Sequence, residues 1–216
     1  MQLQDLIAGF KTVAIASVAD SVDKVCGKRG YLHYDIRPRI SDKRVVGPAV
    51  TVLEGPAPNA GPPQDALDLI DSAEAGSVMV IATEGHADVA VWGGLMTAGA
   101  YARGFAGAIL DGGVRDVLEI RRDYDFPVFA RSISPGSTVG RYKTLGKNLK
   151  VTIGGVEVNP GDLIVADTDG IVAVPREKAA EVLAMSQEID RREAEQAKLI
   201  VESKSLKEGL AKYGRI

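Results

Sequence analysis

Two glycine-rich clusters bring together groups that could hold an organic acid. The first is WGGLM, residues 92–96, and the second is DGGVRD, residues 111–116. Arg115 offers a permanently charged fork that can bind a carboxylate through two hydrogen bonds, and Asp116 offers a hard oxygen donor suited to Mg²⁺ or Mn²⁺. Side by side, they could hold an α-keto acid, with the metal on the keto oxygen and the guanidinium on the carboxylate.

The first cluster precedes a run of small residues that predicts a closely packed helix over 94–103. The first backbone N–H groups of a helix have no partner inside it, so those near Gly93 to Met96 could receive a carboxylate or phosphate. Two plainer interpretations stay open on spacing alone. The glycines could merely permit a sharp turn, and Asp111 or Asp116 could cap a helix over 117–122 and pair with Arg115.

The elements that must position these clusters alternate between strand and helix in the first part of the chain and are nearly all strands over 127–174. This mixture predicts an α/β fold with a β-rich second half. Helices are predicted over 3–25 (one or two), 65–73, 94–103 and 117–122, and strands over 45–53, 77–82, 89–91, 108–110, 127–130, 150–153, 156–158, 163–166 and 171–174. Residues 54–63 are predicted to be a Pro- and Gly-rich loop, and residues 176–216 a helical extension with a long surface helix.

Length and composition favour one domain over residues 1–216 without metal or disulfide staples. The net charge of -3 and the lack of a basic stripe argue against nucleic-acid binding. No apolar run is long enough to span a membrane, the single cysteine, Cys26, cannot form an internal disulfide, and no signal peptide is visible, so we expect a cytoplasmic protein. Zinc clusters and nucleotide-binding glycine loops are also missing from the sequence.

Taken together, the two clusters resemble the core signature of the RraA-like family. Further matches are GPAVTV at 47–52, GGV at 154–156, NPGD at 159–162 and DTDGIV at 167–172, so the resemblance covers roughly residues 12–200. It implies a single-domain swivelling β/β/α fold with a C-terminal helix, assembled as a trimer or hexamer with active sites between subunits. It also implies a divalent-metal (class II) aldolase that releases pyruvate from a 4-hydroxy-2-oxo acid, such as 4-hydroxy-4-methyl-2-oxoglutarate, and decarboxylates oxaloacetate.

Carried over by position, the resemblance implies that Asp116 holds Mg²⁺ (or Mn²⁺) and that Arg115 binds substrate and offsets charge on the enolate oxygen. The amides of Gly94, Leu95 and Met96 would receive the pyruvyl carboxylate. In aldolases of this family an acid often stands where this chain has Gly94, and a glutamate from a neighbouring subunit's C-terminal helix approaches the metal. Here Glu193 or Glu195 would be its counterpart, with Glu193 our choice, although either could belong to a solvated charge run.

The same family contains a second class of protein, the regulators of ribonuclease activity, which bind proteins instead of catalysing a reaction. The regulator's counterpart loop lacks the aspartate that follows the arginine, so Asp116 favours the enzyme. The long charged C-terminal tail keeps the regulator open as the alternative.

Such sequences have also been labelled methyltransferases, but this sequence has no glycine-rich cofactor loop to support that label. We assign Asp111 to shaping the turn.

Overall fold

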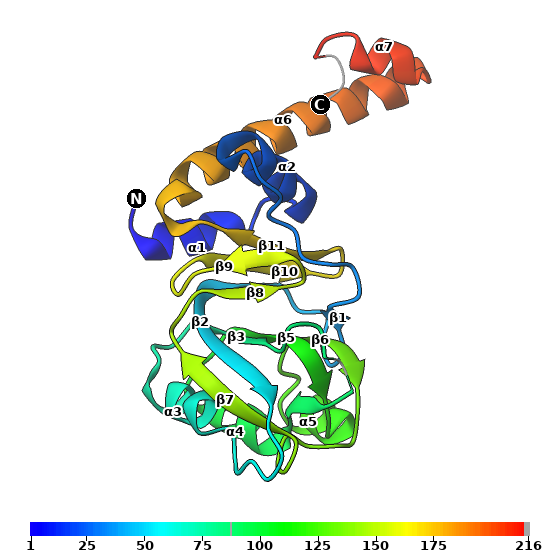
Figure 1. Ribbon diagram of the computed structural model, residues 1–216. Helices are drawn as coiled ribbons and strands as arrows, with labels where there is room; N and C mark the ends of the chain where they lie inside the picture. Colours follow the sequence, from blue (N-terminus) through cyan, green and yellow to red (C-terminus); the bar gives the residue numbers. More distant parts are fainter. Residues whose placement is uncertain (87, 214–216) are drawn as a thin grey trace.

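The computed structural model describes residues 1–86 and 88–213, and its elements lie in layers (Figure 1). The helices are α1 (Leu3–Phe10), α2 (Ile15–Cys26), α3 (Gln64–Ser72), α4 (Gly94–Ala102), α5 (Val117–Asp123), the 3₁₀ turn η1 (Arg176–Lys178), α6 (Ala179–Ser203) and α7 (Leu206–Leu210). The strands are β1 (Arg37–Pro38), β2 (Val45–Pro56), β3 (Val78–Ala82), β4 (Ala90–Trp92), β5 (Gly107–Val114), β6 (Val128–Ile133), β7 (Tyr142–Lys147), β8 (Val151–Ile153), β9 (Val156–Val158), β10 (Leu163–Asp167) and β11 (Gly170–Val174).

The main sheet is built around the long strand β2. Among the described residues its order is β1-β6-β5-β3-β2-β10-β11, with β4 added beside β5 and β7 beside β2. Strands β2, β3, β5 and β6 run parallel, whereas β10 pairs antiparallel with the first part of β2 and β7 with its last part. Because its two ends pair with different strands, β2 joins the parallel half of the sheet to the antiparallel half.

Three apolar cores separate the layers. One lies between the parallel strands and helices α3 to α5, a second between the parallel strands and the β8–β9 hairpin, and a third between β10–β11 and helices α1, α2 and α6. Figure 1 shows the resulting stack, with α3 to α5 at one end and α1, α2 and α6 at the other. Strands β3 and β5 are buried over their whole length, as their near-continuous apolar sequences require.

The α/β class and most predicted elements are confirmed. The helix pair over 3–25 ends at Gly27, whose φ of 64° suits glycine, and the Gly154-Gly155 hairpin joins β8 to β9. Strands β1 and β7 were not predicted, and the strand expected over 127–130 runs to Ile133. Two further boundaries were wrong. The strand expected over 108–110 continues to Val114, and the loop expected over 54–63 begins with three residues of β2 that pair with β7.

The C-terminal segment forms a helical arm that projects beyond the layers (Figure 1). Helix α6 packs against α2 at its start and ends at Ser203, where Lys204 takes a left-handed conformation and α7 folds back on α6. The predicted long helix is therefore broken near its end, and residues 214–216 of the expected extension lie outside the described residues. Within the described ranges, the model contains no helix that is both long and apolar enough to cross a bilayer.

Candidate functional site

The fold brings the two glycine-rich clusters together at one edge of the sheet. Strands β4 and β5 are parallel neighbours, with Trp92 opposite Val114, so the chain leaves both strands at the same edge. The Arg115 N–H donates to the Trp92 carbonyl at 3.0 Å. This hydrogen bond joins the end of β4 directly to the residue that follows β5. Helix α4 begins after β4 and α5 after β5, so each helix start faces the other cluster.

Asp116 points at the start of α4 instead of capping its own helix. It stands at the N-cap position of α5 with φ 59° and ψ 35°, a left-handed conformation that is uncommon for a residue other than glycine, and its side chain makes no cap hydrogen bond there. Its Oδ2 accepts the Gly94 N–H at 2.8 Å. The capping interpretation of Asp116 is therefore wrong. Non-glycine residues held in a left-handed backbone conformation are strained, and such residues are common at functional sites. Here the conformation directs the Asp116 carboxylate toward α4.

The second cluster approaches Gly93 so closely that a side chain at position 93 would displace Asp116 or Arg115. A Cβ atom on Gly93 would lie 2.8 Å from Asp116 Oδ2 and 3.1 Å from the Arg115 side chain. A Cβ on Gly94 would lie 3.4 Å from Asp116 Oδ2, which is ordinary contact. Gly93 thus does more than permit a turn, while position 94 sits beside the Asp116 carboxylate with room for a side chain.

A hydrogen-bonded clamp fixes the first turn of α4. The Trp92 indole N–H donates to Thr97 Oγ1 at 2.7 Å, and both the hydroxyl and the N–H of Thr97 donate to the Gly93 carbonyl at 3.0 Å. The Thr97 bond is the first along the helix, so the N–H groups of Leu95 and Met96 precede it and have no partner inside α4. Two backbone donors therefore remain at this helix start.

Arg115 lines a cavity of about 240 Å³ beside that helix start. Asp116 is not among its lining residues but contacts both Gly94 and Arg115, which are, so we call it the Asp116 cavity. The Arg115 guanidinium Nε lies 3.6 Å from Asp116 Oδ2, and the Arg115 side chain is half-exposed. The cavity is lined by Pro62, Pro63, Leu67, Ala90, Val91, Trp92, Gly93, Gly94, Leu95, Met96, Arg115, Ser137, Thr138 and Val139. The volume of this cavity suits a small organic acid. Leu95, which lines it, is 91% exposed.

Metal donors are sparse at this cavity. Among residues 1–86 and 88–213, no three His, Cys, Asp or Glu side chains converge as a metal cluster. Helix α6 lies at the opposite end of the layers from α4, so a single chain does not bring Glu193 or Glu195 to Asp116 (Figure 1). Neither His33 nor His86 lines this cavity.

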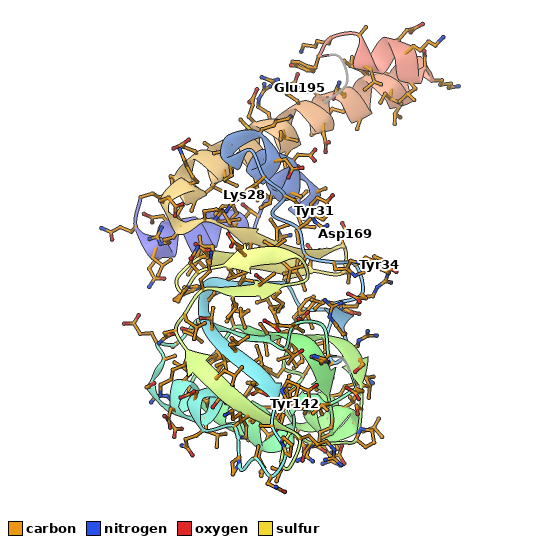
Figure 2. The ribbon with its side chains drawn as sticks, viewed as in Figure 1. Lys28, Tyr31, Tyr34, Tyr142, Asp169 and Glu195 are labelled. Carbon is orange, nitrogen blue, oxygen red and sulfur yellow. The ribbon has the colours of Figure 1, made fainter. Side chains whose placement is uncertain are left out.

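The two candidate glutamates on the arm differ in their surroundings. Glu195, on the arm in Figure 2, accepts hydrogen bonds from Tyr213, Lys212 and Arg191, at 2.5, 2.9 and 2.6 Å. The bonds from Tyr213 and Lys212, with the charges of Lys212 and Arg191, lower the pKa of its carboxyl to about 2. Glu193 is exposed and has no hydrogen bond or ion pair with any described residue. Of the two, Glu193 is the carboxylate without a partner among the described residues.

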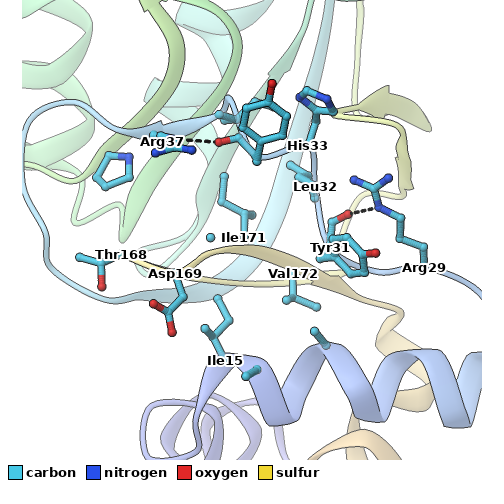
Figure 3. A pocket seen from close by; sticks show the side chains of 16 residues that line it. Ile15, Arg29, Tyr31, Leu32, His33, Arg37, Thr168, Asp169, Ile171 and Val172 are labelled. Carbon is cyan, nitrogen blue, oxygen red and sulfur yellow. Dashed lines mark hydrogen bonds between the residues drawn. The ribbon is translucent and has the colours of Figure 1, made fainter.

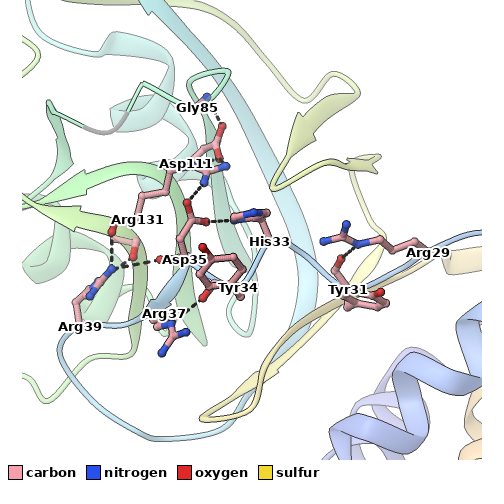
Figure 4. A network of polar contacts seen from close by, with 11 residues as sticks. Arg29, Tyr31, His33, Tyr34, Asp35, Arg37, Arg39, Gly85, Asp111 and Arg131 are labelled. Atoms are coloured by element: carbon pink, nitrogen blue, oxygen red, sulfur yellow. Dashed lines mark hydrogen bonds and ion pairs between the residues drawn. The ribbon is translucent and has the colours of Figure 1, made fainter.

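Asp111 does not shape the turn, contrary to expectation. It lies inside β5, is 2% exposed, and accepts the Gly85 N–H at 2.8 Å. Arg131 of β6 binds its Oδ1 through Nε and Nη2 at 2.8 and 2.7 Å and also pairs with Asp35, which lies 2.7 Å from His33 Nδ1 (Figure 4). Burial alone would raise the pKa of Asp35, but its bond to His33 and the charge of Arg131 lower it.

Sequence reasoning missed Glu54, which was placed in a loop. It lies on β2 opposite Thr144 of β7, is 1% exposed, and neither carboxylate oxygen has a hydrogen-bond partner among the described residues. Burial raises the pKa of its carboxyl to about 7. Residues 45–53 are nearly continuously apolar, so their sequence carries no alternation that would mark position 54 as buried.

Comparisons with known proteins identify the family of this chain. A family model described as RraA-like, Aldolase/RraA, matches residues 15–173. A protein of Halalkalibacterium halodurans named "Putative 4-hydroxy-4-methyl-2-oxoglutarate aldolase" is 32% identical over 83% of this chain and 80% of its own length. Protein DlpA of Legionella pneumophila is 34% identical over 78% of this chain, but the match spans only 27% of DlpA.

Solved structures confirm the expected swivelling fold. An uncharacterized protein from Pseudomonas syringae superimposes with a TM-score of 0.87 at 30% identity, covering 97% of this chain and 94% of that chain. RraAS2 of Streptomyces coelicolor, described as an unusual member of the RNase ES inhibitor RraA protein family, gives a TM-score of 0.80 at 25% identity over 88% of this chain and 95% of its own. With the family model matching most of its length, the chain belongs to the RraA-like family.

Proposed function

We propose that this protein is a divalent-metal-dependent (class II) aldolase that cleaves a 4-hydroxy-2-oxo acid, such as 4-hydroxy-4-methyl-2-oxoglutarate, to pyruvate, and that it also decarboxylates oxaloacetate. The observation that carries the proposal is the position of Asp116 and Arg115 over the start of α4, beside a cavity sized for a small acid. The aldolase name of the H. halodurans relative points to the same chemistry.

The site fits a divalent cation that has one protein ligand, Asp116, and takes its other ligands from the substrate and water. Mg²⁺ usually binds one or two carboxylates and completes its shell with water and substrate oxygens. Asp116 uses only Oδ2 for the Gly94 N–H and the Arg115 contact, so its Oδ1 is available as a ligand. Bound there, Mg²⁺ or Mn²⁺ would act as a Lewis acid toward the 2-oxo group.

The chain's own groups account for binding and charge stabilisation. The free N–H groups of Leu95 and Met96 and the guanidinium of Arg115 would orient the substrate carboxylate, while the Gly94 N–H keeps Asp116 in place. In the retro-aldol step the C4 hydroxyl loses its proton, the C3–C4 bond breaks, and its electron pair becomes the enolate of pyruvate. Arg115 offsets the charge that develops on the enolate oxygen, where a fixed cation lowers the barrier most.

A pyruvate assay tests the proposal on the whole protein. We expect Mg²⁺-dependent pyruvate release from oxaloacetate or from 4-hydroxy-4-methyl-2-oxoglutarate, and a loss of roughly 10²-fold or more in kcat/KM on Asp116→Asn. Asp123→Asn, at the exposed far end of α5, is the matched control and should leave kcat/KM unchanged. If neither substrate yields pyruvate, or if EDTA and Asp116→Asn leave the rate as it was, the proposal fails.

Assembly is part of the same proposal. We expect a homotrimer or hexamer in which Glu193 of a neighbouring copy approaches Asp116, because a single chain leaves Glu193 exposed and remote. Mass photometry gives the oligomeric state. Glu193→Gln should then weaken Mg²⁺ binding measured by calorimetry, whereas Glu202→Gln, an exposed acid farther along α6, should not.

One observation favours a second candidate function. The likeness to RraAS2, whose family is described as RNase ES inhibitors, allows a role as a protein-binding regulator of ribonuclease activity. An inhibition assay on an RNase E-type ribonuclease separates the two functions. A regulator would inhibit the ribonuclease with or without Asp116→Asn, whereas the aldolase would lose activity on that change.

A further inference from the structure

A second cavity lies at the waist of the molecule, on the far side of the parallel sheet from the Asp116 cavity. It measures about 700 Å³ and is enclosed by the start of α2, the segment 29–38 and the turn between β10 and β11 (Figure 3). Its floor consists of buried apolar side chains: Ile15, Leu32, Ile36, Ile171 and Val172. The volume and the apolar floor are typical of small-molecule sites. We call this cavity the waist pocket.

Two arginines on its rim are held in fixed orientations. Arg29 donates its Nε–H to the Tyr31 carbonyl at 2.7 Å, and its guanidinium lies 4.4 Å from the centroid of the Tyr31 ring. Arg37 repeats the arrangement with Tyr34, at 2.7 Å to the carbonyl and 5.7 Å to the ring (Figure 4). Each guanidinium is thus stacked and anchored through Nε, which leaves its terminal nitrogens to bind an anion.

The waist pocket carries an excess of positive charge. Among the described residues, neither Arg29 nor Arg37 takes part in an ion pair with a carboxylate, and Asp169 is the single acid in the lining. The remaining titratable lining groups are Tyr31, Tyr34 and His33, and His33 faces Asp35 through Nδ1 at 2.7 Å. Figure 2 shows Tyr31, Tyr34 and Asp169 grouped at this side of the waist.

The backbone around the waist pocket is fixed before any ligand arrives. The Leu32 N–H donates to Ile171 and the His33 N–H to Gly154, each at 2.9 Å, while Arg37 pairs with Ala130 as part of β1. The segment 29–38 is therefore bonded to β11, to the β8–β9 hairpin and to β6. A site that is ordered in advance binds without paying for loop ordering.

We propose that the waist pocket binds a small anionic molecule with an apolar or aromatic body, the anionic group pairing with Arg29 or with Arg37, which lie at opposite ends of the pocket (Figure 3), and the body resting on the apolar floor. The anionic group is a carboxylate or a phosphate ester, since a guanidinium fork matches both. The waist pocket shares no lining residue with the Asp116 cavity, so the proposal stands apart from the aldolase.

Titration calorimetry on the full chain, with 1-naphthyl phosphate and 1-naphthoate as probes, tests the proposal and distinguishes the two anions. We expect at least one of them to bind with a Kd below about 1 mM. Two control probes should bind about tenfold more weakly: 2-naphthol, which lacks the anionic group, and inorganic phosphate, which lacks the aromatic body. Either Arg29→Gln or Arg37→Gln should weaken probe binding by about tenfold, the loss of one charge-assisted contact, and the double variant should weaken it by at least as much.

Substitutions of opposite sign make the test specific. Asp169→Asn removes the acid of the lining and should tighten binding, whereas Thr168→Glu adds one beside it on an exposed turn and should weaken binding. Arg103→Gln, an exposed arginine outside both cavities, should change nothing. Circular dichroism establishes that each variant is folded.

Three outcomes would overturn the proposal. The first is binding that survives the double variant Arg29→Gln/Arg37→Gln unchanged, and the second is binding that is lost on Arg115→Gln, which would place the probe in the Asp116 cavity. The third is no binding of either anion, as expected if a second copy of the chain covers the waist pocket. Unchanged probe binding by Asp116→Asn supports the assignment even if the proposed aldolase activity fails.

Discussion

Removing the charge of the buried Glu54 should stabilise the protein in a pH-dependent way. The carboxyl is 1% exposed on β2 and has no hydrogen-bond partner among the described residues, so burial favours its neutral form and raises its pKa from the ordinary 4.5 to about 7. A raised pKa means that the folded state holds this proton more tightly than the unfolded state. Stability is then fully present below pH 4.5 and is lost as the pH rises toward 7.

The size of the effect follows from the pKa. At about 1.4 kcal/mol per pKa unit, the rise from 4.5 to about 7 corresponds to a loss of about 3 kcal/mol in the free energy of unfolding, complete above pH 8. Glu54→Gln keeps the shape of the protonated side chain and cannot ionise. The variant should therefore match the wild type near pH 4.5, apart from a constant offset, and exceed it by about 3 kcal/mol at pH 8.

Urea denaturation from pH 4.5 to pH 9, at one protein concentration, measures this difference. Glu157→Gln is the matched control, because Glu157 is exposed and its hydrogen bond with Lys150 lowers the pKa of its carboxyl. That control should gain nothing as the pH rises. A difference between Glu54→Gln and wild type that stays constant from pH 4.5 to 9 would refute the reasoning, since it would mean that Glu54 finds a partner in solution.

Three further substitutions test packing and charge elsewhere. Arg131→Met should lower the free energy of unfolding by about 3–5 kcal/mol in urea, because it leaves Asp111 charged and buried inside β5. Gly93→Ala should lower kcat/KM for the proposed pyruvate release by roughly 10²-fold, because its Cβ would collide with Asp116. Gly47→Ala should cost about 1–3 kcal/mol in urea, because its Cβ would overlap a carbonyl oxygen in the turn before β3.

Each of these changes has a control of the same chemistry. Arg122→Met removes an arginine that pairs on the surface with Asp123, and its unfolding curve should match that of the wild type. Gly136→Ala should keep kcat/KM, since its Cβ would meet nothing closer than 3.8 Å, and Gly61→Ala should keep stability, since its Cβ would point into open space. If a control shifts as far as its test variant, the structural reason offered for that variant is wrong.

The sequence could predict the site where its chemistry is local. Arg115 and Asp116 are adjacent, and the small residues after Trp92 mark the start of α4, so both halves of the cavity could be recognised from short stretches. The Asp116 conformation could not, because capping of α5 and contact with α4 are equally compatible with an aspartate before a helix. The strand pairing that puts Trp92 opposite Val114 decides between them.

Asp111 shows what spacing alone cannot predict. Its counter-charge, Arg131, lies 20 residues later on the neighbouring strand β6, and the pairing of β5 with β6 sets that contact. An acid beside two glycines is typical of a turn, so the local pattern favoured the wrong interpretation. The main strands, by contrast, were predictable, because buried parallel strands require near-continuous apolar sequence.

Glu54 and the waist pocket share the reason that they were missed. Arg29 and Arg37 stand in a stretch with no strong helix or strand pattern, and their value as an anion site arises only because the segment 29–38 is bonded to three separate elements. Glu54 is the first residue of the proline- and glycine-rich stretch 54–63, where a charged side chain is expected to be exposed. In both cases it is burial by distant segments, not residue type, that turns an ordinary charge into a functional candidate.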